Sequence, residues 1–157
     1  MSTKFTTKGA SSDPPTPLTV LLGAVSQSVL RRLHGRLRAC GYDTVTEPHL
    51  VLFGNLDCGA THAAQIAQRM QVSRQAISKT LRELQTLGFV RLEDDPARRN
   101  QKLVVMTKRG MRFALDAREQ LQAIEAEIAA EIGTEALTAL RGALEEYWNT
   151  GIDHRRD

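Results

Sequence analysis

The chain has 157 residues, of which 41% are hydrophobic, 25% charged and 4% aromatic, and it carries a formal net charge of +3. These fractions are ordinary for a globular domain and exclude a wholly disordered or collagen-like chain. No apolar run approaches the roughly 20 residues that a membrane span needs, and residues 1–17 lack the apolar segment of a secretory signal. Two cysteines, Cys40 and Cys58, are too few for a disulfide framework. We therefore expect a cytoplasmic globular protein with no membrane partner.

Basic and acidic residues are separated along the chain. Residues 60–110 contain ten basic and four acidic residues, whereas residues 111–150 contain three basic and eight acidic residues. A basic segment can neutralise phosphates, while an acidic one is repelled by them. A solvated charged surface with no polyanionic partner is the alternative, and charge alone does not separate the two interpretations.

The first part of the chain is predicted to hold a tail and two helices. Residues 1–16 are rich in Ser, Thr and Pro and are expected to form a disordered tail. A long helix is expected between Pro17 and Gly41, because leucine and valine recur there at spacings of three and four. A second, largely buried helix is expected over residues 46–56, with Thr46 as its N-cap.

The middle of the chain has the order helix, turn, helix, hairpin. Thr61 is expected to cap a short helix, and Ser73 is expected to cap a second one over residues 74–87. Two segments that alternate between polar and apolar side chains, residues 89–92 and 102–106, then flank a charged loop. This alternation is typical of the two strands of a β-hairpin.

The C-terminal part is predicted to hold a long helix over residues 107–132, a final helix capped by Thr134, and a flexible tail over residues 151–157. Together with the first helix, these helices carry more apolar surface than a lobe of about 75 residues can cover. Because surplus apolar faces call for a partner, we expect residues 17–45 and 111–150 to form a helical dimerisation region.

The helix over residues 74–87 has the outward face that DNA recognition requires. The major groove admits one α-helix, and small or hydrogen-bonding side chains in its first turns can reach the base edges. Gln75 can pair with adenine and Arg74 with guanine or a phosphate, while the basic hairpin suits the adjacent minor groove or the backbone. The predicted DNA contacts are Ser73, Arg74, Gln75, Ser78, Lys79, Arg82, Arg98, Arg99, Asn100 and Lys102.

Residues 63–90, including the run Val72–Ser78, resemble the DNA-binding core of the multiple-antibiotic-resistance regulator (MarR) family. The hairpin together with the next few residues, 95–110, resembles that family's wing and the start of its next helix. The resemblance implies a mainly α fold with a small β-hairpin wing (α+β). In such a fold residues 46–110 form a winged helix-turn-helix lobe, and the N- and C-terminal helices form the dimerisation region.

For function, the resemblance implies a transcription regulator that binds double-stranded DNA as a homodimer, with repression as the expected effect. The two lobes of such a dimer reach adjacent major grooves, so the operator is expected to be pseudo-palindromic with half-sites about 10 bp apart. A winged-helix protein-interaction module is the alternative, because winged helices also serve protein contacts.

The wing departs from the family pattern Asp-Pro-x-Asp-Arg-Arg. Arg98 stands where the family has its second acid, and Asn100 stands where it has its second arginine. That acid usually braces the arginines in the family. We therefore expect Arg98 and Arg99 either to be looser or to be braced by Asp94 or Glu93.

Relatives often bind small aromatic acids or other lipophiles between the dimerisation helices and the winged lobe. By this resemblance, such an effector would lie among Val25, His49, Phe53 and Phe113, and simple core packing of these residues is the alternative. The sequence does not separate the two.

Some relatives instead use a cysteine in the dimer region to sense peroxides or electrophiles. Cys40 and Cys58 are the candidates for such a redox-sensing regulator, and two inert, partly buried thiols are the alternative. The four histidines show no zinc-site spacing, and the sequence contains no nucleophile elbow, Gly-rich phosphate loop or isolated carboxylate pair. We therefore expect no metal, no cofactor and no enzymatic activity.

Overall fold

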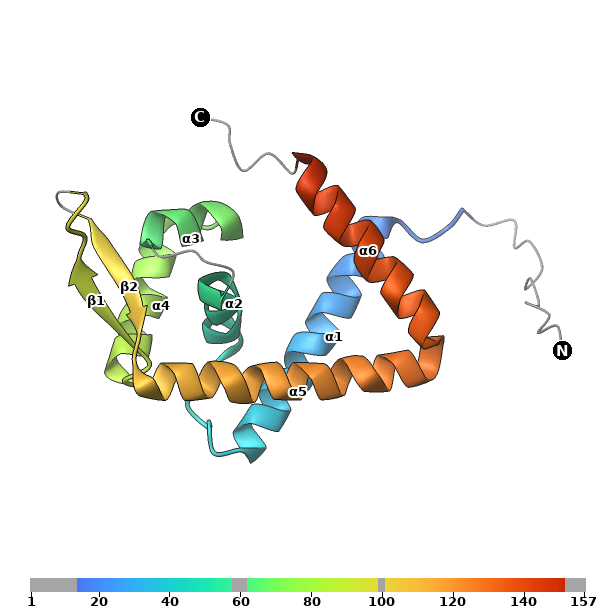
Figure 1. Ribbon diagram of the computed structural model, residues 1–157, viewed down its shortest axis with the longest axis horizontal. Coiled ribbons are helices and arrows are strands. Elements are labelled where there is room, and N and C mark those ends of the chain that lie inside the picture. The colour runs from blue at the N-terminus through green and yellow to red at the C-terminus, as the bar shows by residue number, and fades with distance from the viewer. Residues whose placement is uncertain (1–13, 58–61, 99–100, 152–157) are drawn as a thin grey trace, which may run out of the picture.

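The computed structural model describes residues 14–57, 62–98 and 101–151, and eight elements follow one another in these ranges (Figure 1). They are α1 (Leu18–Ala39), α2 (Glu47–Asp57), α3 (Ala63–Met70), α4 (Arg74–Thr86), β1 (Val90–Asp94), β2 (Lys102–Met106), α5 (Lys108–Ile132) and α6 (Thr134–Gly151). The predicted mainly α fold with one β-hairpin is confirmed. Most of the two predicted tails, and the predicted sites at Cys58, Arg99 and Asn100, lie outside the described residues.

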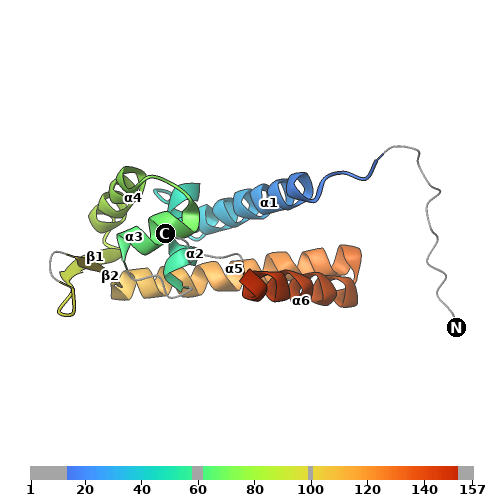
Figure 2. The same cartoon turned by 90° about the horizontal axis from the view of Figure 1, so that it is seen from above.

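Helix α5 connects the two ends of the molecule (Figure 1). Its N-terminal half lies against a lobe made of α2, α3, α4 and the β1–β2 hairpin, and its C-terminal end leads into α6, which folds back beside it (Figure 2). Helix α1 crosses α5 and also packs on α2. Arg32 and Arg36 of α1 both pair with Glu127 of α5, so two of the cations of α1 hold this crossing in place.

Local sequence signals set the ends of the helices. Ser73 Oγ accepts a hydrogen bond from the Ala76 N–H across 3.1 Å, so α4 is capped as predicted. Thr107 Oγ1 accepts one from the Gly110 N–H across 3.0 Å and caps α5 in the same way. Gly133 ends α5 with a φ of 93°, a left-handed conformation that favours glycine.

Three predicted boundaries are corrected by the structure. The N-cap of α3 is His62 rather than Thr61, because the helix starts one residue later. Strand β1 spans Val90–Asp94 rather than residues 89–92, because its pairing with β2 continues into the charged segment while Phe89 turns into the core. Thr134 is the first residue of α6 rather than its cap.

An aromatic cluster joins the lobe to α5. The Phe113 ring of α5 lies 4.7 Å from Phe53 of α2, 5.0 Å from Phe89 and 4.9 Å from Tyr42, measured between ring centroids. Gly110 stands one turn before Phe113, and a Cβ at that position would lie 2.0 Å from the carbonyl oxygen of Phe89. Only glycine therefore allows α5 to start this close to the base of the hairpin.

The first half of α1 and most of α6 leave apolar side chains uncovered. Leu33 and Leu37, in the second half of α1, are buried in the core. The exposed large apolar side chains of the two helices are Leu18, Val20, Leu21, Leu22 and Val25 on α1 and Leu140, Leu144, Tyr147 and Trp148 on α6. In the described ranges, no helix combines the length and the apolar character needed to cross a membrane.

Candidate nucleic-acid interface

Helix α4 presents a polar face to solvent. Ile77, Leu81 and Leu84 on its inner side are at most 2% exposed and anchor the helix on the lobe. The outer side carries six of the predicted contact residues, all of which are exposed: Ser73, Arg74, Gln75, Ser78, Lys79 and Arg82. The described part of the chain therefore leaves this face open to a partner.

Several of these side chains also have hydrogen bonds along the helix. Ser78 Oγ donates to the carbonyl oxygen of Arg74 across 2.8 Å, and Arg82 Nε donates to the carbonyl oxygen of Ser78 across 3.1 Å. Lys79 Nζ lies 3.9 Å from a carboxylate oxygen of Glu83, one turn further on. The Arg82 guanidinium has five N–H donors, so one bond to its own helix leaves it donors for a phosphate.

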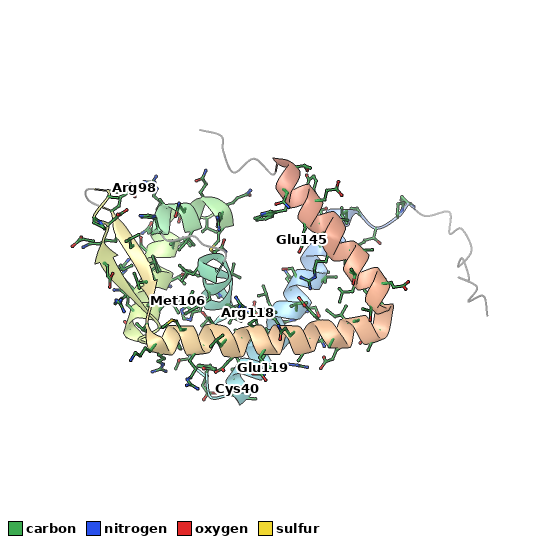
Figure 3. All side chains as sticks on the ribbon, viewed as in Figure 1. Cys40, Arg98, Met106, Arg118, Glu119 and Glu145 are labelled. Carbon is green, nitrogen blue, oxygen red and sulfur yellow. The ribbon has the colours of Figure 1, made fainter. Side chains whose placement is uncertain are left out.

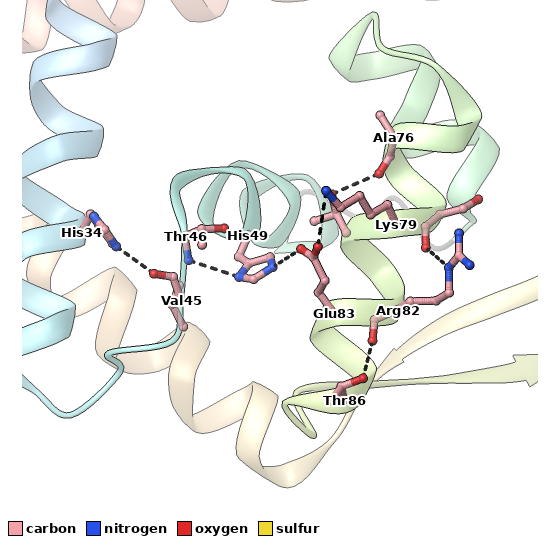
Figure 4. Close-up of polar contacts among 11 residues, drawn as sticks. His34, Val45, Thr46, His49, Ala76, Lys79, Arg82, Glu83 and Thr86 are labelled. Atoms are coloured by element: carbon pink, nitrogen blue, oxygen red, sulfur yellow. Dashed lines mark hydrogen bonds and ion pairs between the residues drawn. The ribbon is translucent and has the colours of Figure 1, made fainter.

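His49 joins α2 to α4 (Figure 4). Its side chain is 3% exposed, its Nδ1 accepts a hydrogen bond from the Thr46 N–H across 3.1 Å, and its Nε2 donates to a Glu83 carboxylate oxygen across 3.0 Å. The proton lies on Nε2, because Nδ1 needs its lone pair to accept the first bond. His49, predicted to line an effector pocket, borders a pocket of about 610 Å³ between the start of α2 and α4, with Lys79 and Glu83 on its wall.

The β1–β2 hairpin forms the wing, and Arg98 lies at its tip (Figure 3). Glu93 pairs with Arg91 and Asp94 pairs with Lys102. The two acids that the sequence offered as braces for Arg98 are therefore engaged with other basic residues of the hairpin. Arg98 and Lys102 remain exposed, as a role in DNA contact requires.

Asp95, the residue after β1, is the acid that organises the wing. Its Oδ2 accepts a hydrogen bond from His62 Nε2 across 2.8 Å, and its Oδ1 accepts one from the Ala97 N–H, also across 2.8 Å. The bond from His62 is the largest reason that the pKa of Asp95 lies below its ordinary value, and the Ala97 N–H and the Arg98 charge lower it further. Sequence reasoning missed His62, although a histidine immediately before a helix was a visible signal.

The predicted effector residues do not all come together. Phe53 and Phe113 line a small pocket of about 140 Å³ between α1, α2 and α5, with Leu121 on its wall. Val25 lies away from this pocket and is 55% exposed, because the first half of α1 extends past the lobe. His49 lines a different pocket, between α2 and α4, so the pocket beside Phe113 contains two of the four predicted residues.

The predicted redox site is described only at Cys40. This residue is an exposed free thiol at the C-terminal end of α1, so the alternative of a partly buried thiol is wrong for it (Figure 3). Among the residues that the structure describes, no three His, Cys, Asp or Glu side chains form a group that could hold a metal ion.

The lobe that carries these residues matches a known family. Residues 49–99, from α2 into the wing, match the sequence model of the MarR family. This lobe is therefore similar to the corresponding part of MarR-family proteins. A comparison of the chain with curated proteins gives no match.

Solved structures of MarR proteins have the same fold. Wild-type apo MarR from E. coli has a TM-score of 0.71 and 19% identity over 85% of this chain and 98% of that chain. A MarR family transcriptional regulator from Rhodococcus sp. RHA1 has a TM-score of 0.65 and 23% identity, over 85% and 97% of the two chains. The MarR family protein Rv2887 of Mycobacterium tuberculosis, in complex with salicylic acid, has a TM-score of 0.66 and 23% identity, over 85% of this chain and 97% of that chain. The MarR fold of this chain thus extends well beyond the matched lobe.

Proposed function

We propose that this chain is a sequence-specific DNA-binding transcription regulator of the MarR family that acts as a homodimeric repressor. The observation that carries the proposal is the exposed polar face of α4 beside a hairpin with Arg98 at its tip. A helix with small and hydrogen-bonding side chains in its first turns fits the major groove, and a basic hairpin beside it fits the backbone or the minor groove. The similar Rhodococcus protein is a transcriptional regulator.

The residues of the interface divide into two roles in this proposal. Gln75 and Arg74 read base edges, because their side chains can form bidentate hydrogen bonds to adenine and guanine. The remaining contacts position the protein on phosphates, the sugar backbone and the minor groove, and they are Ser73, Ser78, Lys79, Arg82, Arg98, Arg99, Asn100 and Lys102.

The uncovered faces of α1 and α6 support a dimer. Leu21 is 48% exposed on α1, and Leu144 and Trp148 are 40% and 54% exposed on α6. A second copy of the chain would cover both faces, since exposed apolar side chains gathered on one helix face mark an interaction site. Two-fold symmetry then sets two copies of α4 on adjacent major grooves, about 10 bp apart.

A small aromatic or lipophilic effector is the proposed signal that relieves repression. The pocket between Phe53 and Phe113 supports this, because its wall also includes Arg118, whose charge would attract a carboxylate. The similar Mycobacterium tuberculosis protein is in complex with salicylic acid. Salicylate added to the protein–operator complex is expected to release the DNA, and an unchanged affinity at saturating salicylate would remove this effector class from the proposal.

The experiment that tests DNA binding is footprinting on the DNA upstream of the coding sequence, followed by affinity measurements at increasing salt. The logarithm of the affinity should fall with the logarithm of the salt concentration, with a slope of about 0.9 for each phosphate neutralised. Lys79→Ala should reduce the slope by about this amount. Arg112→Ala, which removes an exposed charge on α5 outside the predicted contacts, is the matched control and should leave the slope unchanged. An affinity that ignores salt would favour the protein-interaction module.

A further inference from the structure

We propose that His62 is the positioning residue of the wing, so that the hairpin that carries Arg98 is held by the start of α3 rather than by an acid of its own. This inference rests on the proposed DNA binding. It concerns a contact that joins the helix-turn-helix to the hairpin, and it assigns that contact a role in presenting Arg98 to DNA.

His62 contacts the hairpin at two places, the residue that follows β1 and the strand β2. Its Nε2 donates to Asp95 Oδ2, just after β1, across 2.8 Å, and its backbone forms an isolated antiparallel bridge with Leu103 of β2. The two side chains of the His62–Asp95 pair are 11% and 7% exposed, so water competes little for this hydrogen bond. One residue before α3 thus fixes the hairpin at two points.

Asp95 transmits this position to the wing turn. Its second carboxylate oxygen accepts from the Ala97 N–H, its backbone N–H donates to Gln101 across 3.0 Å, and its carbonyl oxygen accepts from the Arg98 N–H across 3.3 Å. A shift of the Asp95 side chain would therefore change the turn from which Arg98 projects. His62 acts on Arg98 through Asp95 and has no proposed contact with DNA.

The other two acids of the wing form ion pairs with other residues, so the His62–Asp95 hydrogen bond is left to hold the wing turn. Glu93 pairs with Arg91 and Asp94 pairs with Lys102, both within the hairpin. Position 98, at which the family pattern has an acid, is occupied by arginine. The internal brace of the wing is thus replaced by a contact with a different part of the lobe.

Two variants of His62 separate wing positioning from helix capping. His62→Asn keeps a good N-cap, but its short side chain replaces only the Nδ1 side of the ring and does not reach Asp95. His62→Gln is a poorer N-cap, but its amide nitrogen can take the place of Nε2 and donate to Asp95. A merely structural role in capping predicts that Asn is the better substitute, whereas wing positioning predicts that Gln is.

The first readout needs no DNA. Amide hydrogen exchange at Ala97 and Asp95 in the free, full-length protein is expected to be about tenfold faster in His62→Asn and close to wild type in His62→Gln. Exchange at Leu84, in the core of α4, should stay unchanged and shows that the lobe is folded.

The second readout measures coupling to Arg98 on footprinted operator DNA. Arg98→Ala is expected to weaken binding about tenfold in the wild-type background and less than about threefold in His62→Asn, because residues in one network are not additive. In His62→Gln the Arg98→Ala effect should return to about tenfold. If the effect is the same in all backgrounds, or if exchange at Ala97 does not respond to His62→Asn, the proposal is wrong. If the wild-type protein binds no DNA, the proposed function is wrong, and so is the role of His62 in presenting Arg98 to DNA. The exchange data then still test whether the His62–Asp95 contact holds the wing turn.

Discussion

His49 of α2 donates a hydrogen bond from Nε2 to Glu83 of α4 across 3.0 Å, and this bond connects the buried core of the lobe to the helix that carries the exposed polar face. The ring is almost wholly buried, while the Glu83 side chain is 45% exposed. The same carboxylate faces Lys79, one of the predicted phosphate contacts, through its other oxygen. One glutamate therefore contacts both a buried side chain of α2 and a predicted DNA contact on the outer face of α4.

Glu83→Ala should destabilise the protein through His49 rather than through the lost surface charge. Removal of the acceptor leaves the buried Nε2–H without its partner, which costs about 1–2 kcal/mol. Glu93→Ala is the matched control, because Glu93 has a similar exposure and pairs with Arg91 at the surface. Surface pairs of this kind contribute about 0–1 kcal/mol. Urea unfolding measures both, and equal losses would contradict a structural role for the His49 bond.

Asp95 should make the stability of the protein fall in acid. Its folded-state pKa lies below the ordinary 3.8, mainly because of the bond from His62. The bond therefore contributes fully above the ordinary pKa and is lost as the pH falls through the lower, folded-state pKa. The difference in urea midpoint between wild type and Asp95→Asn should be constant near neutral pH and should shrink below about pH 4. A difference that grows in acid would have the wrong sign for this interaction.

Tyr42 should titrate at unusually high pH. Burial and the hydrogen bond that its hydroxyl donates to Asp116 of α5 raise its pKa to about 12. Because the folded-state pKa is higher than the ordinary 10.0, the contribution to stability is complete below pH 10 and is lost as the pH rises toward 12. The tyrosinate absorbance of wild type minus that of Tyr42→Phe isolates this titration. A midpoint near the ordinary value would mean that the loop before α2 is not held on α5.

Local signals explain why much of the fold was predictable from the sequence. Ser73, Thr107 and Gly133 mark helix ends through interactions with their immediate neighbours, and the outer face of α4 follows from helical spacing. The contacts that the sequence did not predict, His62 with Asp95 and His49 with Glu83, join residues 33 and 34 positions apart. Nothing in either local pattern selects the partner, because the choice depends on how the hairpin and α2 pack around α4.

The sequence also predicted the lining of the effector pocket only in part. Phe53 and Phe113 were placed together by the family resemblance, as lining of an effector pocket or as core packing, and their rings do meet. Val25 continues the apolar stripe of α1, but α1 is longer than the lobe, so this part of the stripe extends beyond it. Periodicity identifies a face of a helix but not the point along the helix at which its partner ends.

Gln75→Ala should change which DNA sequences the protein binds. If Gln75 forms a bidentate contact with an adenine, the substitution should cost about 1–3 kcal/mol on the operator and relax the base preference at one position in each half-site. Gln85→Ala is the matched control, because Gln85 is an exposed residue of the last turn of α4, away from the predicted contacts. Affinities for the operator and for random DNA measure the effect. An equal loss on both would show that Gln75 contacts only the backbone.

Leu144→Asp should split the proposed dimer, because it adds a charge to the exposed apolar face of α6. Leu121, by contrast, is a poor position for this test, since it lines the pocket beside Phe113 and a charge there would disturb the core of the chain itself. Leu115→Asp is the control: Leu115 is 65% exposed on the half of α5 that lies against the lobe. Sedimentation should show a monomer for Leu144→Asp and a dimer for wild type and Leu115→Asp. The monomer should also bind the operator far more weakly, because the two half-sites are then bound independently. A Leu144→Asp protein that remains dimeric would exclude α6 from the interface and leave its apolar face without this explanation.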